Sequence, residues 1–184
     1  MIPWVALLVA GLTPVVAAPA GQPSGIWLDV PFIKQEKNGC GAASIAMVMR
    51  YWQHQQGNPP SADADDIQRA LYSRPAQGIY VSDMERYFQQ HGFRTFAFAG
   101  NWNDLKEDLE KGRPLIVALK PAGSELHYVV VVGLDWQQDL VLKNDPAERK
   151  LLKQERSDFE KEWKAAGNWT LLAVPQSADR GAHP

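Results

Sequence analysis

The chain has 184 residues and a net charge of −2, with 45% hydrophobic and 22% charged residues. This length and composition are typical of one globular domain with a sizeable core and argue against a disordered chain. The near-neutral charge gives no basic surface for nucleic acid, and the single cysteine excludes an intramolecular disulfide and a cysteine-rich zinc site. The four histidines show neither the HExxH spacing nor a paired carboxylate pattern for a metal, and there is no glycine-rich phosphate loop. We expect no metal and no organic cofactor.

The first 20 residues carry no charged side chain and run from an apolar stretch into small residues. This pattern predicts a secretory signal peptide, cleaved after Ala18 or Ala20, and therefore an exported protein, periplasmic or secreted. The basic residue that usually precedes such a stretch is missing, which leaves an uncleaved N-terminal membrane anchor as the alternative. The stretch is too short and too interrupted by proline to predict a regular membrane span.

The remaining chain divides into a domain over residues 26–175 and a polar tail over 176–184. Hydrophobic periodicity predicts helices mainly in its first half and strands mainly in its second. The expected elements in chain order are a short edge strand or extended segment 27–33, a buried helix 40–53, two amphipathic helices after residues 61 and 82, a strand 93–98, a helix 102–111, strands 114–120, 127–134, 140–144 and 150–152, a helix 156–165 and a strand 169–174. We therefore expect an α+β fold in which N-terminal helices pack on a C-terminal antiparallel sheet.

Two serines are expected to cap helices in the first half of the chain. Ser61 follows a pair of prolines and precedes an amphipathic stretch, as an N-cap would. Ser82 is followed three residues later by Glu85, which is the capping-box pattern.

The only cysteine, Cys40, lies between Gly39 and Gly41 where a loop becomes the buried helix. Unpaired N–H groups and the positive end of the macrodipole in the first helical turn favour thiolate over thiol, which suits nucleophilic attack on a carbonyl carbon. Such attack creates an oxyanion that needs two donors. The backbone N–H of Cys40 and the side-chain amide of Gln35 are the candidates.

A cysteine nucleophile needs a base, and the base needs an acceptor that orients it. His127 begins an apolar strand, and Asp145 follows the next strand, so both should lie at the same edge of an antiparallel sheet. We expect the Asp145 carboxylate to accept a hydrogen bond from Nδ1 of the imidazole. Asn144 is the alternative for this orienting role.

Each of these residues also has an ordinary structural interpretation. A lone cysteine is commonly a small buried hydrophobe, a histidine at a strand start is commonly structural, and aspartate before proline is a common turn residue. The combination of the residues, rather than any one of them, favours catalysis.

Three motifs together resemble a known family. They are Gln35 followed by Cys40-Gly41 and Ala43-Ser44, then His127-Tyr128-Val129-Val130-Val131-Val132-Gly133, and then Asn144-Asp145-Pro146. The chain resembles the bacteriocin-processing cysteine peptidases that remove double-glycine leaders, and the segment 158–163 is similar to a Phe-and-Trp motif of that family. The resemblance covers about residues 28–174.

The resemblance implies a papain-like fold with Cys40 as nucleophile, His127 as base and acid, Asp145 as orienting residue and Gln35 in the oxyanion hole. The best-known members are fused to ABC transporters, which implies association with an export system. We therefore expect an exported cysteine endopeptidase, a hydrolase acting on a peptide or protein. The alternatives are a peptide-binding module that does not cut, and a thiol amidase or transpeptidase acting on cell-wall peptides.

Overall fold

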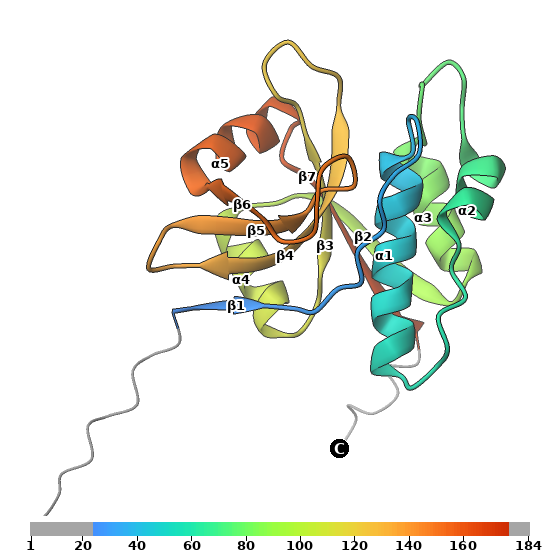
Figure 1. Ribbon diagram of the computed structural model, residues 1–184, viewed down its shortest axis with the longest axis horizontal. Helices are drawn as coiled ribbons and strands as arrows, with labels where there is room; N and C mark the ends of the chain where they lie inside the picture. The colour runs from blue at the N-terminus through green and yellow to red at the C-terminus, as the bar shows by residue number, and fades with distance from the viewer. Residues whose placement is uncertain (1–23, 177–184) are drawn as a thin grey trace, which may run out of the picture.

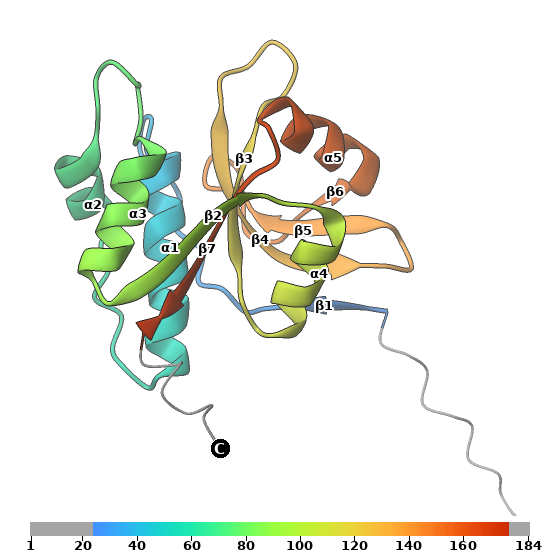
Figure 2. The same cartoon turned by 180° about the vertical axis from the view of Figure 1, so that it is seen from behind.

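The computed structural model describes residues 24–176, which form a layer of three helices, a central sheet and two further helices (Figures 1 and 2). The helices are α1 Cys40–Gln55, α2 Ala64–Leu71, α3 Val81–Gln90, α4 Trp102–Glu110 and α5 Arg156–Ala165. The strands are β1 Gly25–Trp27, β2 Phe93–Ala99, β3 Leu115–Leu119, β4 His127–Asp135, β5 Leu140–Asn144, β6 Leu152–Glu155 and β7 Trp169–Pro175. The expected α+β plan is confirmed.

The sheet is antiparallel throughout, in the order β2-β7-β3-β4-β5-β6, and β1 adds to β4. Leu119 pairs with His127 where β3 passes into β4, and Val130 pairs with Asn144 near the end of β5. The beginning of β4 and the end of β5 therefore lie side by side, at the edge of the sheet where these two strands begin and end, as the strand order in the sequence predicts.

Two apolar cores lie on the two faces of the sheet. Along β4, Tyr128, Val130 and Val132 join the core beneath α1, whereas Val129 and Val131 join the core beneath α4 and α5. This double coverage explains why the strand reads as a continuous apolar run. Helix α1 is buried along most of its length because it lies between the sheet and the helices α2 and α3 (Figure 1).

Both serine-cap predictions are wrong. Helix α2 is capped by Asp63, whose carboxylate accepts hydrogen bonds from the N–H groups of residues 65 and 66, whereas Ser61 pairs with the side chain of Gln53. Helix α3 begins at Val81 with no side-chain cap, so Ser82 already lies inside the first turn. A residue inside the turn is no longer placed to bond the N–H groups that an N-cap satisfies.

One strand boundary differs from expectation, and residues 27–33, expected as a short edge strand or an extended segment, lie outside any strand after Trp27. The N-terminal strand ends at Trp27, and only the N–H of Leu28 continues the pairing, with the carbonyl of Val132 at 2.8 Å. The segment beyond contains Pro31, which has no N–H to donate. The strand expected at residues 150–152 lies at Leu152–Glu155, after Leu151 has turned the chain with φ of 53°.

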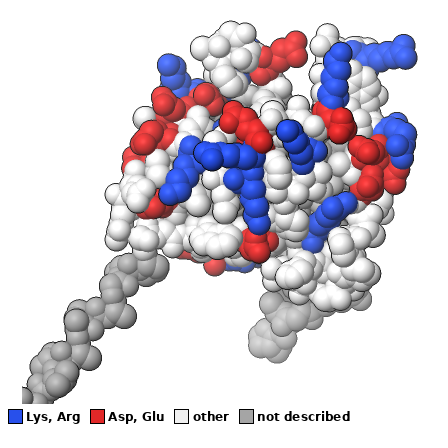
Figure 3. Space-filling model, in the orientation of Figure 1, with Lys and Arg blue, Asp and Glu red and all other residues white. Residues whose placement is uncertain are grey.

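On the face shown in Figure 3, basic and acidic side chains are interspersed. Exposed charges form pairs across the protein, such as Lys150 with Asp29 at 2.6 Å and Lys106 with Glu110 at 3.7 Å. Exposed pairs of this kind contribute only about 0–1 kcal/mol each, so the two cores carry the stability of the fold.

Among residues 24–176, no helix has the length and apolar character needed to cross a bilayer. The predicted signal peptide over residues 1–20 lies outside the described residues, as do residues 177–184 of the predicted tail.

Candidate active site

Cys40 is the first residue of α1, and its side chain is half-buried. The glycines beside it make room for close neighbours: a Cβ on Gly41 would lie 3.2 Å from the side chain of Ile79, and one on Gly39 would lie 3.0 Å from the carbonyl oxygen of Glu36. Hydrogen bonds from the backbone N–H groups of Gly41 and Tyr128 reach the sulfur. The sequence-based placement of the thiol at a loop-to-helix transition is thus confirmed.

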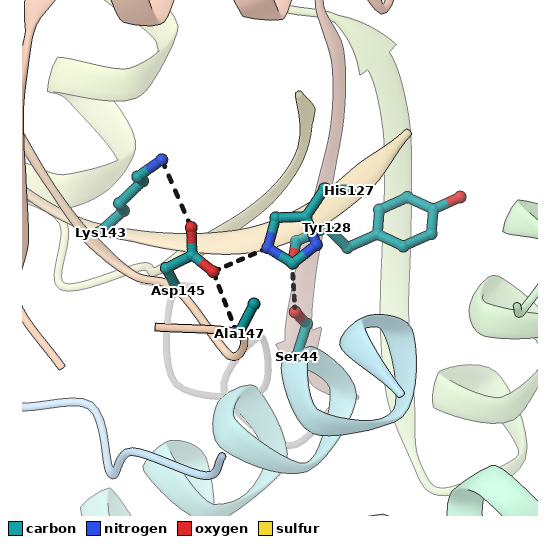
Figure 4. A network of polar contacts seen from close by, with 6 residues as sticks. All are labelled: Ser44, His127, Tyr128, Lys143, Asp145 and Ala147. Atoms are coloured by element: carbon teal, nitrogen blue, oxygen red, sulfur yellow. Dashed lines mark hydrogen bonds and ion pairs between the residues drawn. The ribbon is translucent and has the colours of Figure 1, made fainter. Parts of the chain in front are cut away.

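His127 and Asp145 meet at the edge of the sheet (Figure 4). The imidazole Nε2 lies 2.7 Å from Oδ1 of Asp145, and that oxygen also accepts the N–H of Ala147 at 3.1 Å. We expected Nδ1 to face the carboxylate, and this was wrong. His127 also shares a hydrogen bond with Cys40, so the ring lies between the thiol and the carboxylate. Because Nε2 contacts Asp145, the nitrogen that remains for the sulfur is Nδ1.

Asn144, the alternative orienting residue, faces elsewhere. Its amide nitrogen donates to the carbonyl of Val30 at 3.1 Å, and its oxygen accepts the N–H of Leu151 at 3.0 Å. Side chains of consecutive strand residues point to opposite faces, so Asn144 and Asp145 diverge. Asn144 is fully buried and joins the N-terminal segment to the loop after β5.

The thiol and the imidazole each stabilise the charged form of the other. Burial raises the pKa of the Cys40 thiol, but the hydrogen bonds from His127 and from two backbone N–H groups, together with the imidazolium charge, bring it below its ordinary value. Burial lowers the pKa of His127, but hydrogen bonds to Asp145 and Cys40 and their charges raise it to about 9. These opposite shifts favour a thiolate–imidazolium pair at neutral pH.

The carboxyl group of Asp145 is held in its charged form. Burial raises its pKa, but the hydrogen bond and charge of His127, the nearby ammonium group of Lys143 and the N–H of Ala147 lower it below its ordinary value. Asp145 is therefore suited to stabilise a positive imidazolium ring.

Tyr128 connects the helix to the sheet directly beside the thiol. Its carbonyl oxygen accepts a hydrogen bond from the hydroxyl of Ser44 at 3.5 Å, which ties α1 to β4. Its ring packs edge-on against Trp169, with the ring centres 5.5 Å apart. Burial and the charge of Cys40 raise the pKa of the Tyr128 phenol to about 12, so this group stays protonated.

Gln35 lies in the loop before Cys40 and contacts the turn that follows Asp145. Its backbone N–H donates to the carbonyl of Pro146 at 2.9 Å. Its half-buried side chain keeps an amide oxygen that is buried without a hydrogen-bond partner among residues 24–176. Buried polar atoms without a partner are rare in folded proteins, so this oxygen makes Gln35 a candidate binding residue.

A groove of about 770 Å³ opens beside the thiol. Two projecting loops flank it, one before α3 and one between β3 and β4 (Figure 1). The lining residues are Cys40, Tyr128, residues 75–81 before and at the start of α3, Lys120, residues 124–126 and residues 165–166 at the end of α5. An extended peptide placed in this groove would pass the sulfur atom.

A model of the Peptidase_C39 like family matches residues 27–171. The chain belongs to this family. It is therefore a cysteine peptidase by family, which confirms the resemblance drawn from the sequence motifs. A comparison with curated protein sequences finds no match.

Solved structures with a similar fold include two peptidases associated with transporters. The double glycine motif protease from an AMS/PCAT transporter, in complex with the leader peptide, is 20% identical with a TM-score of 0.61, covering 84% of this chain and 99% of that one. The peptidase domain of Streptococcus ComA, a bi-functional ABC transporter, is 20% identical with a TM-score of 0.62, covering 79% and 97%. Procathepsin L 3 of Tenebrio molitor is 13% identical with a TM-score of 0.62, covering 88% and 73%. The fold is papain-like.

Sequence reasoning missed Lys143, whose ammonium group lies beside Asp145. A signal was present, because Lys143 interrupts the apolar run of β5 two residues before Asp145. Residues two apart in a strand share a face, so this spacing could have placed the two charges together.

Proposed function

We propose that the chain is an exported cysteine endopeptidase in which Cys40, His127 and Asp145 act as a catalytic triad and Gln35 completes the oxyanion hole. The observation that carries the proposal is the hydrogen-bonded series Cys40–His127–Asp145 across the junction of α1 and the sheet. Opposite pKa shifts of the thiol and the imidazole support it, since they match a nucleophile and a general acid.

The reaction begins with attack of the Cys40 thiolate on a peptide carbonyl carbon. The new oxyanion receives hydrogen bonds from the backbone N–H of Cys40 and from the side-chain amide of Gln35. The imidazolium of His127 gives its proton to the leaving amine as the carbon–nitrogen bond breaks, which leaves a thioester on Cys40. Water, deprotonated by neutral His127, then attacks the thioester and releases the acid and the thiolate.

The substrate of the proposed enzyme is an extended peptide. The groove beside Cys40 supports this, because it opens at the thiol, and a similar fold is solved in complex with a leader peptide. Action beside an export system is proposed by analogy with the ABC-transporter origin of two structural neighbours. Recognition of a double-glycine sequence is not part of the proposal.

The export proposal rests on the uncharged apolar stretch of residues 1–20. Its test is expression of the full chain in a bacterium, followed by cell fractionation and N-terminal sequencing of the product. A new N-terminus at Pro19 or Gly21 in the exported fraction is expected. Full-length protein in the cytoplasmic fraction would contradict export.

The peptidase proposal is tested by alkylating Cys40 with iodoacetamide across the pH range, in the full chain under mild reductant. The wild type is expected to react well below the ordinary thiol pKa of 9.0, and His127→Ala to lose this low-pH reactivity. His91→Ala removes an exposed histidine and serves as the matched control.

A wild-type thiol that reacts only at alkaline pH would overturn the proposed mechanism and favour the peptide-binding module. Where the low-pH reactivity is present, incubation with a mixed peptide library and mass spectrometry of the products then identifies the bond that is cut. Peptide products with free carboxylates support hydrolysis, whereas products joined to a second amine would reassign the chain to transpeptidation.

A further inference from the structure

Lys143 is a buried charged residue that the proposed mechanism leaves without a role. The residue is 6% exposed on β5, and among residues 24–176 it is the only buried lysine. Lysine is almost never fully buried unless it is paired, because removing an ammonium group from water costs several kcal/mol. A buried Lys143 therefore needs a partner of opposite charge.

The partner is the second carboxylate oxygen of Asp145. Nζ of Lys143 lies 3.5 Å from Oδ2, while Oδ1 accepts hydrogen bonds from His127 at 2.7 Å and from the N–H of Ala147 at 3.1 Å. In Figure 4 the lysine and the histidine lie on opposite sides of the carboxylate. The two oxygens thus have separate partners, and rotation of the carboxylate would break both sets of contacts.

We propose that Lys143 is a positioning residue of the active site, whose buried ammonium group holds Oδ2 of Asp145 so that Oδ1 stays directed at His127. This inference rests on the proposed triad. Lys143 contacts the orienting residue rather than the thiol, and it acts on Cys40 through the Asp145–His127 contacts and through its own charge.

The other charges around this pair are more exposed. His127, Asp145 and Lys143 all line a cavity of about 540 Å³, together with Glu125 and Glu148 from loops, Glu162 from α5 and Lys153 from β6. Glu125, Glu148 and Lys153 are exposed and Glu162 is half-buried. Exposed charges are screened by salt within about 8–10 Å, so after His127 the buried lysine is the charge that acts most strongly on Asp145.

The sign of the expected effect follows from charge alone. Removing a cation favours the protonated form of every neighbouring acid, so the pKa values of Asp145, His127 and Cys40 all rise in a Lys143 variant without charge. An opposite charge within about 4–6 Å shifts a carboxyl pKa by roughly 1–3 units. The more distant thiol is expected to shift by about half a unit, which lowers its alkylation rate on the acid limb about threefold.

The experiment measures iodoacetamide alkylation of Cys40 against pH in Lys143→Met, Lys143→Gln and Lys143→Arg. The two uncharged variants are expected to move the acid limb to higher pH by about half a unit, and Lys143→Arg to restore the wild-type curve. Lys153→Met is the matched control, because it removes an exposed lysine from the same cavity and should leave the curve in place.

Urea unfolding of each variant separates positioning from a structural role. Removal of one partner of a buried ion pair is destabilising, so Lys143→Met should unfold at a lower urea concentration than the wild type, and its alkylation curve is compared only under conditions in which it is folded. Uncharged variants whose alkylation curves coincide with the wild type overturn the role of Lys143 while the triad stands. A wild type without low-pH reactivity overturns the triad, and the role of Lys143 falls with it.

Discussion

Replacing Cys40 with alanine should change how the stability of the protein depends on pH. The folded-state pKa of His127, about 9, lies above its ordinary value of 6.5, so this group contributes stability below pH 6.5 that is lost as the pH rises through 9. The folded-state pKa of Cys40 lies below its ordinary 9.0, so the thiol contributes stability above pH 9 that is lost as the pH falls through its folded-state value.

In the wild type these two dependences have opposite signs, and they cancel over the part of the range from pH 6.5 to 9 in which the folded thiol is ionised. In that window the unfolded chain holds its proton on the thiol, and the folded chain holds it on the imidazole, so both states bind the same number of protons. The pair therefore adds no slope to the free energy of unfolding, which responds to pH only where the two states bind different numbers of protons.

Cys40→Ala removes the pH dependence that the thiol contributes and leaves that of the imidazole. His127 keeps the raising influence of Asp145, so the folded variant still binds a proton that the unfolded variant has lost. The full rise from 6.5 to about 9 would correspond to about 3.4 kcal/mol at 1.36 kcal/mol per pKa unit. Because Cys40 supplies part of that rise, we expect a loss of about 1–2 kcal/mol between pH 6.5 and 9.

The assay is urea unfolding of both proteins at half-unit steps from pH 6 to 9.5, with the free energy of unfolding extrapolated to water. The difference between the two curves isolates the Cys40–His127 pair from other titrating groups. Parallel curves would refute the reasoning, because they would mean that the wild-type thiol and imidazole do not share a proton in the folded state.

Three further predictions concern the neighbours of this pair. Asp145→Asn should lower the pKa of His127 by about 1–2 units, seen by NMR titration of the ring, and an unchanged titration near 9 would remove Asp145 from the orienting role. Asn144→Ala should lower the free energy of unfolding by about 1–3 kcal/mol, because the carbonyl of Val30 and the N–H of Leu151 lose their hydrogen bonds. The alkylation profile should stay unchanged, and a shifted profile would instead place Asn144 at the imidazole. Gln35→Ala should lower kcat about 100-fold with little change in the alkylation rate, and an unaffected kcat would exclude its amide from the oxyanion hole.

Hydrophobic periodicity was sufficient to predict most of the fold. Helix α5 lies at Arg156–Ala165 as expected, and β4 and β5 lie within one residue of their expected bounds. These elements have strong apolar patterns because each faces one of the two cores or both. The cap of α2 was assigned to Ser61 instead of Asp63, since both residue types favour the position and only the path of the chain decides between them.

The site could be predicted in part for a related reason. Strand order placed His127 and Asp145 at one edge of the sheet, and alternation along β5 placed Asn144 and Asp145 on opposite faces. Neither observation tells which face meets the imidazole or which ring nitrogen meets the carboxylate. Those choices depend on where α1 docks, which is set by contacts between distant segments such as that between Ser44 and Tyr128.

The docking of α1 on the sheet, to which the contact between Ser44 and Tyr128 contributes, also brings the thiol to the imidazole. Cys40 belongs to the helical layer, whereas His127 and Asp145 belong to the sheet, and the two layers meet in a shared apolar core. A chain that has made its first helices but not docked the sheet holds an ordinary thiol. Low-pH reactivity of Cys40 therefore requires α1 docked on the sheet, and a chain truncated before His127 would carry the nucleophile without the base that activates it.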